Sequence, residues 1–138
     1  MSSYALSLLM AIVACVIGGI FGGMALARPG PTPGLAEAET ATNSIATQGR
    51  AFGGLLILAH AGTALYLGYQ PSVGAAMAFG LALAWLGSAL GRLASIGLDR
   101  IPARAEAGNL AFEILIGLTL CLPFFNAGRL VLRGGMIA

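Results

Sequence analysis

Residues 51–98 read AFGGLLILAHAGTALYLGYQPSVGAAMAFGLALAWLGSALGRLASIGL, and this stretch decides the fold. It contains two apolar runs, residues 51–69 and 73–98, which are separated by Gln70-Pro71-Ser72. A bilayer core about 30 Å thick requires about 20 apolar residues in a helix that rises about 1.5 Å per residue. Both runs are therefore predicted to span a membrane, and the short connection forces them into an antiparallel hairpin.

Two further apolar runs flank this hairpin, at residues 4–27 and 110–127. The chain of 138 residues has a hydrophobic fraction of 58% and a mean hydropathy of +0.91. Only 9% of its residues are charged, whereas a typical soluble domain carries about 25%. We therefore predict an all-α fold, in which residues 1–138 form one integral membrane domain built as a four-helix bundle.

The first run is interpreted as a retained transmembrane helix and not as a signal peptide. No basic residue precedes it, and it is longer than the roughly 7–15 apolar residues of a signal sequence. The loop that follows begins with several prolines and glycines, which break helices. Its later part, residues 35–47, has neither Pro nor Gly and is a candidate for a short interfacial helix.

Charged and aromatic residues near the span ends predict the topology. Loop one (residues 28–50) and loop three (residues 99–109) share one membrane face and carry four arginines near the span ends. The opposite face, on which both termini lie, carries two, Arg129 and Arg133. The positive-inside rule therefore predicts cytoplasmic loops and external termini. Aromatic residues gather near the face of the termini, as an interfacial belt would; they are Tyr4, Tyr66, Tyr69, Phe124 and Phe125.

Small residues recur at helical spacing in two of the spans. Gly18 and Gly22, and then Gly19 and Gly23, form overlapping GxxxG pairs. The third span carries Ala76, Gly80, Ala84 and Ser88, followed by Gly87, Gly91 and Ser95. Small residues allow membrane helices to approach closely. These faces are expected either to pack within the chain or to contact a second protein.

The most specific pattern is polar. Ser88, Arg92, Ser95 and Asp99 follow one another at steps of four, three and four, so they form one stripe on the third helix. Arg92 lies about 9 Å inside the predicted helix end, and Glu113 lies about 6 Å from the same face. A lone charge in hydrocarbon is unfavourable by at least about 2.5–3.5 kcal/mol, so we expect these two residues to pair with each other or with nearby partners.

Arg50 begins the second span at the same face, so we expect it to lie beside this cluster. Three interpretations stay open for Arg50, Arg92, Ser95, Asp99 and Glu113. They form a clasp that fixes helix orientation, a pocket for a lipid headgroup or small anion, or a proton-coupled site as in small multidrug transporters.

His60 lies at the middle of the second span. An ionisable residue at this depth is a candidate functional residue, although a neighbouring carbonyl or hydroxyl can also hold a neutral imidazole. The sequence has no second histidine, which excludes a two-histidine haem or metal site within one chain but leaves a pigment that takes a single ligand. We predict no cofactor and no metal site. Pro123 is expected to kink the fourth helix, and Cys15 and Cys121, at different depths, are expected to remain unpaired.

Several function classes are disfavoured. The net charge of +2 is small, and five of the seven arginines flank membrane spans, so we predict no nucleic-acid binding. His60 lies at mid-membrane, whereas Asp99 and Glu113 lie nearer one face, so no Ser-His-acid set can form. Neither a phosphate-binding glycine loop nor a dinucleotide motif is present. We therefore predict that the protein is not an enzyme.

The same residues carry a family resemblance. Arg50-Ala51-Phe52-Gly53-Gly54, then Gly91-Arg92, Ser95, Asp99 and Pro102, and finally Glu113 resemble domain of unknown function 4345 over residues 43–125. The family pattern has Gly after the Asp, where this chain has Arg100, and often Tyr before the paired glycines, where it has Phe52. The resemblance implies a small four-span protein of the bacterial inner membrane and implies no reaction.

The leading functional expectation is a non-enzymatic accessory subunit or scaffold, which packs against itself as a homo-oligomer or against a larger membrane complex. The alternative is a binder or transporter of a membrane lipid or small anion that uses the Arg92 and Glu113 region.

Overall fold

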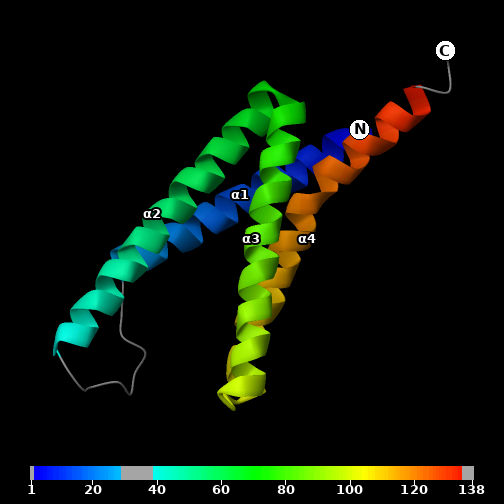
Figure 1. Cartoon of the computed structure of the whole chain (residues 1–138). Helices are drawn as coiled ribbons and strands as arrows, with labels where there is room; N and C mark the ends of the chain where they lie inside the picture. The colour runs from blue at the N-terminus through cyan, green and yellow to red at the C-terminus, as the bar shows by residue number, and fades with distance from the viewer. Residues whose placement is uncertain (1, 29–38, 135–138) are drawn as a thin grey trace.

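The structure is a computed structural model that describes residues 2–28 and 39–134, with side chains at residues 2–28 and 45–127. This part of the chain forms four helices and no strand: α1 (Ser3–Ala27), α2 (Glu39–Tyr69), α3 (Pro71–Leu98) and α4 (Ala103–Gly134) (Figure 1). Each helix contains a segment that is long and apolar enough to cross a membrane. The predicted all-α bundle with four spans is therefore confirmed.

Local sequence explains where the helices begin. The hydroxyl of Ser2 accepts a hydrogen bond from the backbone N–H of Ala5 at 3.2 Å and so caps α1. Pro71 occupies the first turn of α3, where its fixed φ and missing N–H are compatible with a helix. Gln70 alone connects α2 to α3. The connection is therefore shorter than the three residues that the sequence suggested, although the two helices diverge away from it (Figure 1).

Two helices begin well before their apolar runs. α2 begins at Glu39 and α4 at Ala103, whereas the apolar runs begin at residues 51 and 110. Residues 39–47, the described part of the candidate interfacial helix, are the first turns of α2 and not a separate helix; residues 35–38 lie outside the described part. Hydropathy indicates where a helix enters lipid and not where the helix begins. No proline interrupts α2 near residue 51 or α4 near residue 110, so both helices extend beyond their apolar runs.

The four helices pack as two arms, one formed by α1 and α2 and the other by α3 and α4. The arms meet near the α2–α3 connection and separate toward the opposite end, where α2 begins and α3 ends (Figure 1). Contacts between α1 and α4 also join the arms. The molecule is therefore wedge-shaped, with an opening toward loops one and three.

Glycines hold α1 and α2 at close range. A Cβ atom added to Gly18 would lie 2.1 Å from Nε2 of His60, and one added to Gly22 would lie 2.8 Å from Cβ of Leu56. At Gly53, the added atom would lie 2.6 Å from the carbonyl oxygen of Gly22. The Gly18 and Gly22 pair therefore packs within the chain, as close helix packing in lipid requires.

An aromatic cluster joins the two arms behind the opening. The ring of Phe21 in α1 lies 6.0 Å from that of Trp85 in α3 and 5.5 Å from that of Phe112 in α4, measured between centroids. Trp85 and Phe112 are 5.7 Å apart and nearly perpendicular, a favourable arrangement for aromatic pairs. Trp85 is buried and belongs to the core, which is otherwise rich in alanine.

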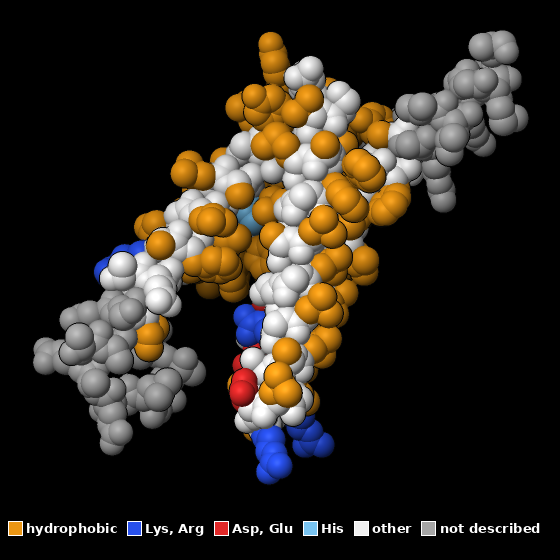
Figure 2. Space-filling model, in the orientation of Figure 1, with side chains coloured by type: hydrophobic (Ala, Val, Ile, Leu, Met, Phe, Trp, Pro, Cys, Tyr) orange, Lys and Arg blue, Asp and Glu red, His pale blue; other side chains and the backbone are white. Residues whose placement is uncertain are grey.

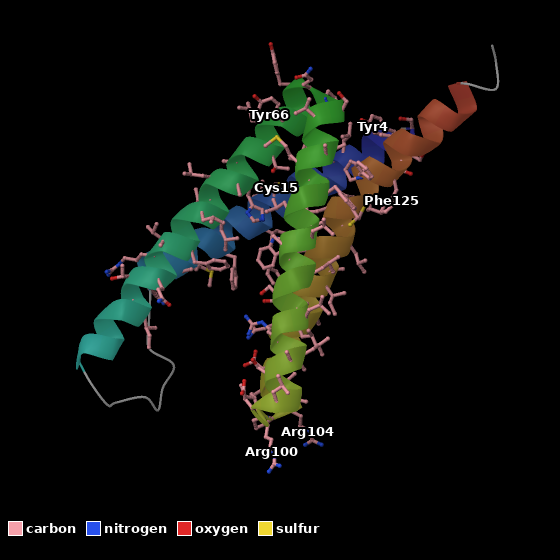
Figure 3. The ribbon with its side chains drawn as sticks, viewed as in Figure 1. Tyr4, Cys15, Tyr66, Arg100, Arg104 and Phe125 are labelled. Atoms are coloured by element: carbon pink, nitrogen blue, oxygen red, sulfur yellow. The ribbon has the colours of Figure 1, made fainter. Side chains whose placement is uncertain are left out.

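The outside of the bundle is apolar, as a lipid-facing surface must be. Large exposed side chains include Val16, Leu58, Leu90 and Leu115, one from each helix, and orange apolar atoms cover most of the visible surface (Figure 2). Tyr4, Tyr66 and Phe125 lie toward one end, whereas Arg100 and Arg104 lie at the other (Figure 3). This distribution agrees with the predicted aromatic belt and the predicted charged face.

Two other residue predictions concern the helix interiors. Pro123 lies inside α4, and α4 changes direction in its orange part (Figure 1), as expected where a proline removes a backbone hydrogen bond. Cys15 and Cys121 are both free.

Candidate functional site

A cleft of about 280 Å³ lies between the two arms and is lined by side chains of all four helices. Its lining residues are Phe21, Phe52, Leu55, Leu56, Leu81, Ala84, Trp85, Ser88, Arg92 and Glu113. The polar members lie on the arm formed by α3 and α4, and the arm formed by α1 and α2 contributes apolar side chains. Blue and red atoms accordingly face the hollow from the α3 side (Figure 2). The cleft is thus amphipathic.

Arg92 and Glu113 form the centre of its polar wall. Nε of Arg92 donates to Oε1 of Glu113 at 2.7 Å, and the hydroxyl of Ser88 donates to the same oxygen at 2.8 Å. The structure therefore pairs the two charges that the sequence placed at one depth. A charge-assisted hydrogen bond of this kind offsets part of the desolvation of both groups.

Glu106 completes the cluster, and the sequence analysis did not assign it to the site. Nη1 of Arg92 donates to Oε2 of Glu106 at 2.5 Å. From hydropathy alone, Glu106 falls in the connection between the apolar runs 73–98 and 110–127. In α4, however, Glu106 precedes Glu113 by seven residues, which is about two helical turns, so both carboxylates lie on one face. That spacing was the signal that could have identified it.

Glu113 is unusual because one of its oxygens lacks a partner. Its side chain is buried, with 3% of the residue exposed. Oε1 accepts two hydrogen bonds, whereas Oε2 is buried and has no hydrogen-bond partner in the described part of the chain. Buried polar atoms are normally satisfied, so an exception calls for a functional explanation.

Within the described part of the chain, Ser95 and Asp99, two other members of the predicted cluster, make no side-chain hydrogen bond or ion pair to Arg92 or Glu113. Ser95 lines a neighbouring shallow pocket of about 380 Å³ with Arg92 and Glu106. Asp99 is exposed and caps α3, where its backbone N–H donates to the carbonyl oxygen of Ser95 at 2.9 Å. Among the residues with described side chains, no ion pair of Asp99 is found.

Arg50, expected beside the cluster, is exposed on α2 and does not line the cleft. None of the ion pairs found within residues 2–28 and 45–127 includes it. The physical reason is the separation of the arms, which carries the beginning of α2 away from the end of α3 (Figure 1).

His60 contacts Leu56 and Trp85, two residues that line the cleft. Its pale blue atoms are visible between α2 and α3 (Figure 2). The backbone carbonyl of Leu56 lies 2.7 Å from Nδ1, and the indole Nε1 of Trp85 donates to Nε2 at 3.0 Å. A neutral imidazole protonated at Nδ1 satisfies both contacts. A pigment metal ligated by Nε2 would have to displace Trp85, so the geometry favours a structural role for His60.

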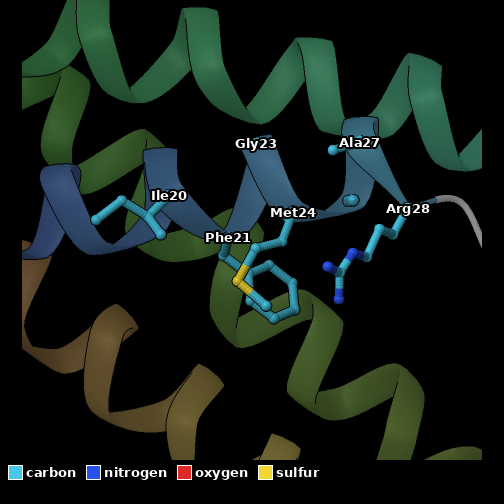
Figure 4. Close-up of a pocket in the computed structure, with 7 residues that line it drawn as sticks. Ile20, Phe21, Gly23, Met24, Ala27 and Arg28 are labelled. Carbon is cyan, nitrogen blue, oxygen red and sulfur yellow. The ribbon is translucent and has the colours of Figure 1, made fainter.

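Among the described residues, no group of three His, Cys, Asp or Glu side chains is suited to hold a metal ion. A broader hollow of about 710 Å³ shares Phe21 with the cleft, and its described lining residues, including Met24 and Arg28, belong to α1 and its end. Phe21, Met24 and Arg28 project from one side of α1 into this hollow (Figure 4).

Comparison with known proteins gives one match. The family model described as domain of unknown function (DUF4345) matches residues 5–123, and so includes the first helix, which the resemblance drawn from the motifs had left out. No curated protein and no solved structure matches the chain.

Proposed function

Since the chain belongs to the DUF4345 family of unknown function, we propose from the cleft's geometry that it binds a membrane amphiphile, a lipid, between its two arms. The apolar part of the ligand would contact Leu55, Leu81 and Trp85, and its headgroup would contact Ser88, Arg92 and Glu113. One observation carries this proposal: a buried, partly unsatisfied carboxylate lies in the polar wall of an amphipathic cleft between the membrane-spanning arms.

The size and lining of the cleft support an amphiphile. Its volume of about 280 Å³ is at the lower end of the roughly 300–1,000 Å³ typical of small-molecule pockets, so it suits one part of a ligand whose remainder lies in the bilayer. The cluster contains two carboxylates and one guanidinium. This excess of negative charge disfavours a small anion, the other ligand that the sequence left open. We propose binding, not catalysis, because the one histidine already has both nitrogens engaged.

We propose that this site faces the cytoplasmic leaflet of a bacterial inner membrane, with both termini in the periplasm. The excess of arginines that flank loops one and three supports this orientation. The two arms separate toward the charged end of the bundle, at which Arg100 and Arg104 lie (Figure 3).

The test compares phospholipid retention by the wild-type protein and by a variant whose cleft is blocked by a larger side chain. The full chain is purified in a mild detergent, and bound phospholipid is counted by native mass spectrometry. Ala84 is exposed and lines the cleft, so Ala84→Trp should reduce retention by about tenfold. Ala61→Trp is the control. Ala61 is also an exposed alanine and is adjacent to His60, just as Ala84 is adjacent to Trp85, the partner of His60, but Ala61 is not among the residues that line the cleft. Equal retention by all three proteins would refute the proposal.

A second candidate function is the accessory subunit or scaffold. Gly80, Gly87 and Gly91 are exposed on α3, and a Cβ atom added to any of them would meet no described atom within 4 Å. Such a face of small residues could accept another helix. If it does, Gly87→Leu should reduce the mass of the purified assembly on native electrophoresis, whereas Gly68→Leu, at an equally open position of α2, should not. An unchanged mass for Gly87→Leu would exclude this candidate.

A further inference from the structure

The unpaired oxygen of Glu113 indicates what kind of headgroup the cleft takes. Oε2 needs a hydrogen-bond donor, and the described residues supply none. We infer that the ligand carries a primary ammonium group, which donates to Glu113; this inference rests on the lipid-binding function proposed above. The terminal torsion of a glutamate is soft, and the inferred binding requires the carboxylate of Glu113 to turn Oε2 toward the cleft that Glu113 already lines.

The charge of the cluster favours the same group. Arg92 contributes one positive charge, and Glu106 and Glu113 contribute two negative charges when ionised. One negative charge therefore remains without a partner in the cluster, in a region where an uncompensated charge is unfavourable. An ammonium group neutralises it and supplies N–H donors at once. A quaternary choline group neutralises the charge but has no N–H to donate.

The arm formed by α1 and α2 supplies a counterpart for a phosphate. Arg28 projects into the hollow that adjoins the cleft at Phe21 (Figure 4), and it belongs to neither of the ion pairs found among the described side chains. The carboxylates on one arm and the guanidinium on the other are opposite in sign to the ammonium and phosphate groups of a zwitterionic aminophospholipid. The inferred ligand is therefore a phospholipid with a primary ammonium headgroup.

The test compares headgroups on one fluorescent acyl chain. Dissociation constants of the full-length protein in detergent are measured for phosphatidylethanolamine, phosphatidylcholine and phosphatidylglycerol, and dodecylamine is used as a competitor that lacks phosphate. We expect phosphatidylethanolamine to bind about tenfold more tightly than phosphatidylcholine. Glu113→Gln should abolish this preference, because it removes the negative charge that the ammonium group would neutralise. Arg28→Gln should weaken phosphatidylethanolamine binding but not competition by dodecylamine.

The outcomes separate the two levels of the proposal. If phosphatidylcholine or phosphatidylglycerol binds as tightly as phosphatidylethanolamine and Ala84→Trp still abolishes binding, the lipid-binding function stands and the ammonium inference is refuted. If no lipid binds to the wild-type protein, both are refuted. If Arg28→Gln weakens dodecylamine and phosphatidylethanolamine equally, Arg28 does not bind phosphate, and the aminophospholipid is refuted in favour of a simple amphiphilic amine. The wild-type comparison alone decides the preference if Glu113→Gln fails to fold.

Discussion

The indole Nε1 of Trp85 donates to Nε2 of His60 at 3.0 Å and thereby links α3 to α2 at the base of the cleft. Both residues are buried, and the opposite nitrogen of His60 is held by the carbonyl of Leu56. The bond joins the two arms at the level where they begin to separate. It therefore fixes the relative position of the arms and, with it, the floor of the cleft.

Trp85→Phe should destabilise the bundle because it leaves Nε2 of His60 without a donor. Loss of such a bond is worth about 1–3 kcal/mol in a buried soluble site and about 0.6 kcal/mol on average between membrane helices, so we expect about 1 kcal/mol. Unfolding by sodium dodecyl sulfate, followed by circular dichroism, measures it. In a His60→Leu background the same change should have a smaller effect. Equal effects in both backgrounds would show that the bond contributes nothing.

Gly18→Ala should destabilise the protein by about 1–3 kcal/mol, the usual range for overpacking. The new methyl group would lie 2.1 Å from Nε2 of His60, so α1 or the imidazole must move. Gly23→Ala is the matched control, because its methyl group would meet no described atom within 4 Å. The two variants are compared by the same detergent titration. Equal stability would mean that α1 and α2 are not closely packed at Gly18.

The sequence was sufficient for the architecture because the bilayer imposes helix length and apolar composition. It also predicted that Arg92 and Glu113 would pair with each other or with nearby partners, since both lie inside the same membrane face, where a lone charge is unfavourable. It did not identify Trp85 as the partner of His60, because that contact depends on the register between two helices. The separate position of Arg50 depends on the angle between the arms, which spacing along one helix does not encode.

Arg100→Gly should stabilise the turn between α3 and α4. Arg100 has a φ of 55°, in the left-handed region, where a Cβ atom raises the energy by about 1–2 kcal/mol. The family resemblance described above leads us to expect Gly at this position, and the left-handed backbone gives a physical reason for it. Allowing for the greater freedom of glycine in the unfolded chain, we expect a gain of up to about 1 kcal/mol in unfolding free energy. Arg100→Ala removes the same charge but keeps the Cβ, so it should give no gain; an equal gain would assign the effect to charge.

The orientation of the bundle can be measured directly. In a chain that carries Cys15→Ala and Cys121→Ala, single cysteines are introduced at Ala105, near the start of α4, and at Gln70, between α2 and α3. A membrane-impermeant maleimide applied to intact cells should label position 70 and leave position 105 unlabelled until the cells are opened. Labelling of position 105 alone in intact cells would reverse the proposed topology and place the cleft in the outer leaflet.

The ion pair can be tested as a unit. Glu113→Gln weakens the acceptor of both Arg92 and Ser88 and should destabilise the protein by less than the roughly 3–5 kcal/mol seen for buried pairs in soluble proteins, because Arg92 can extend toward water. Ser88→Ala should also destabilise, by about 1 kcal/mol, whereas Ser95→Ala should not, since no hydrogen bond of the Ser95 side chain to Glu113 is found.

Arg92→Met combined with Glu113→Met then separates structure from function. The double variant removes both charges of the buried pair. It leaves Glu106 without Arg92, but the Glu106 side chain is 24% exposed and can be hydrated, so the bundle should fold with nearly wild-type stability. If it folds but no longer retains phospholipid, the pair binds the headgroup. If it folds and retains phospholipid as the wild type does, Arg92 and Glu113 only orient the helices, and the lipid-binding assignment of this cluster is wrong. The comparison uses native mass spectrometry and the same detergent titration, so stability and binding are measured on one preparation.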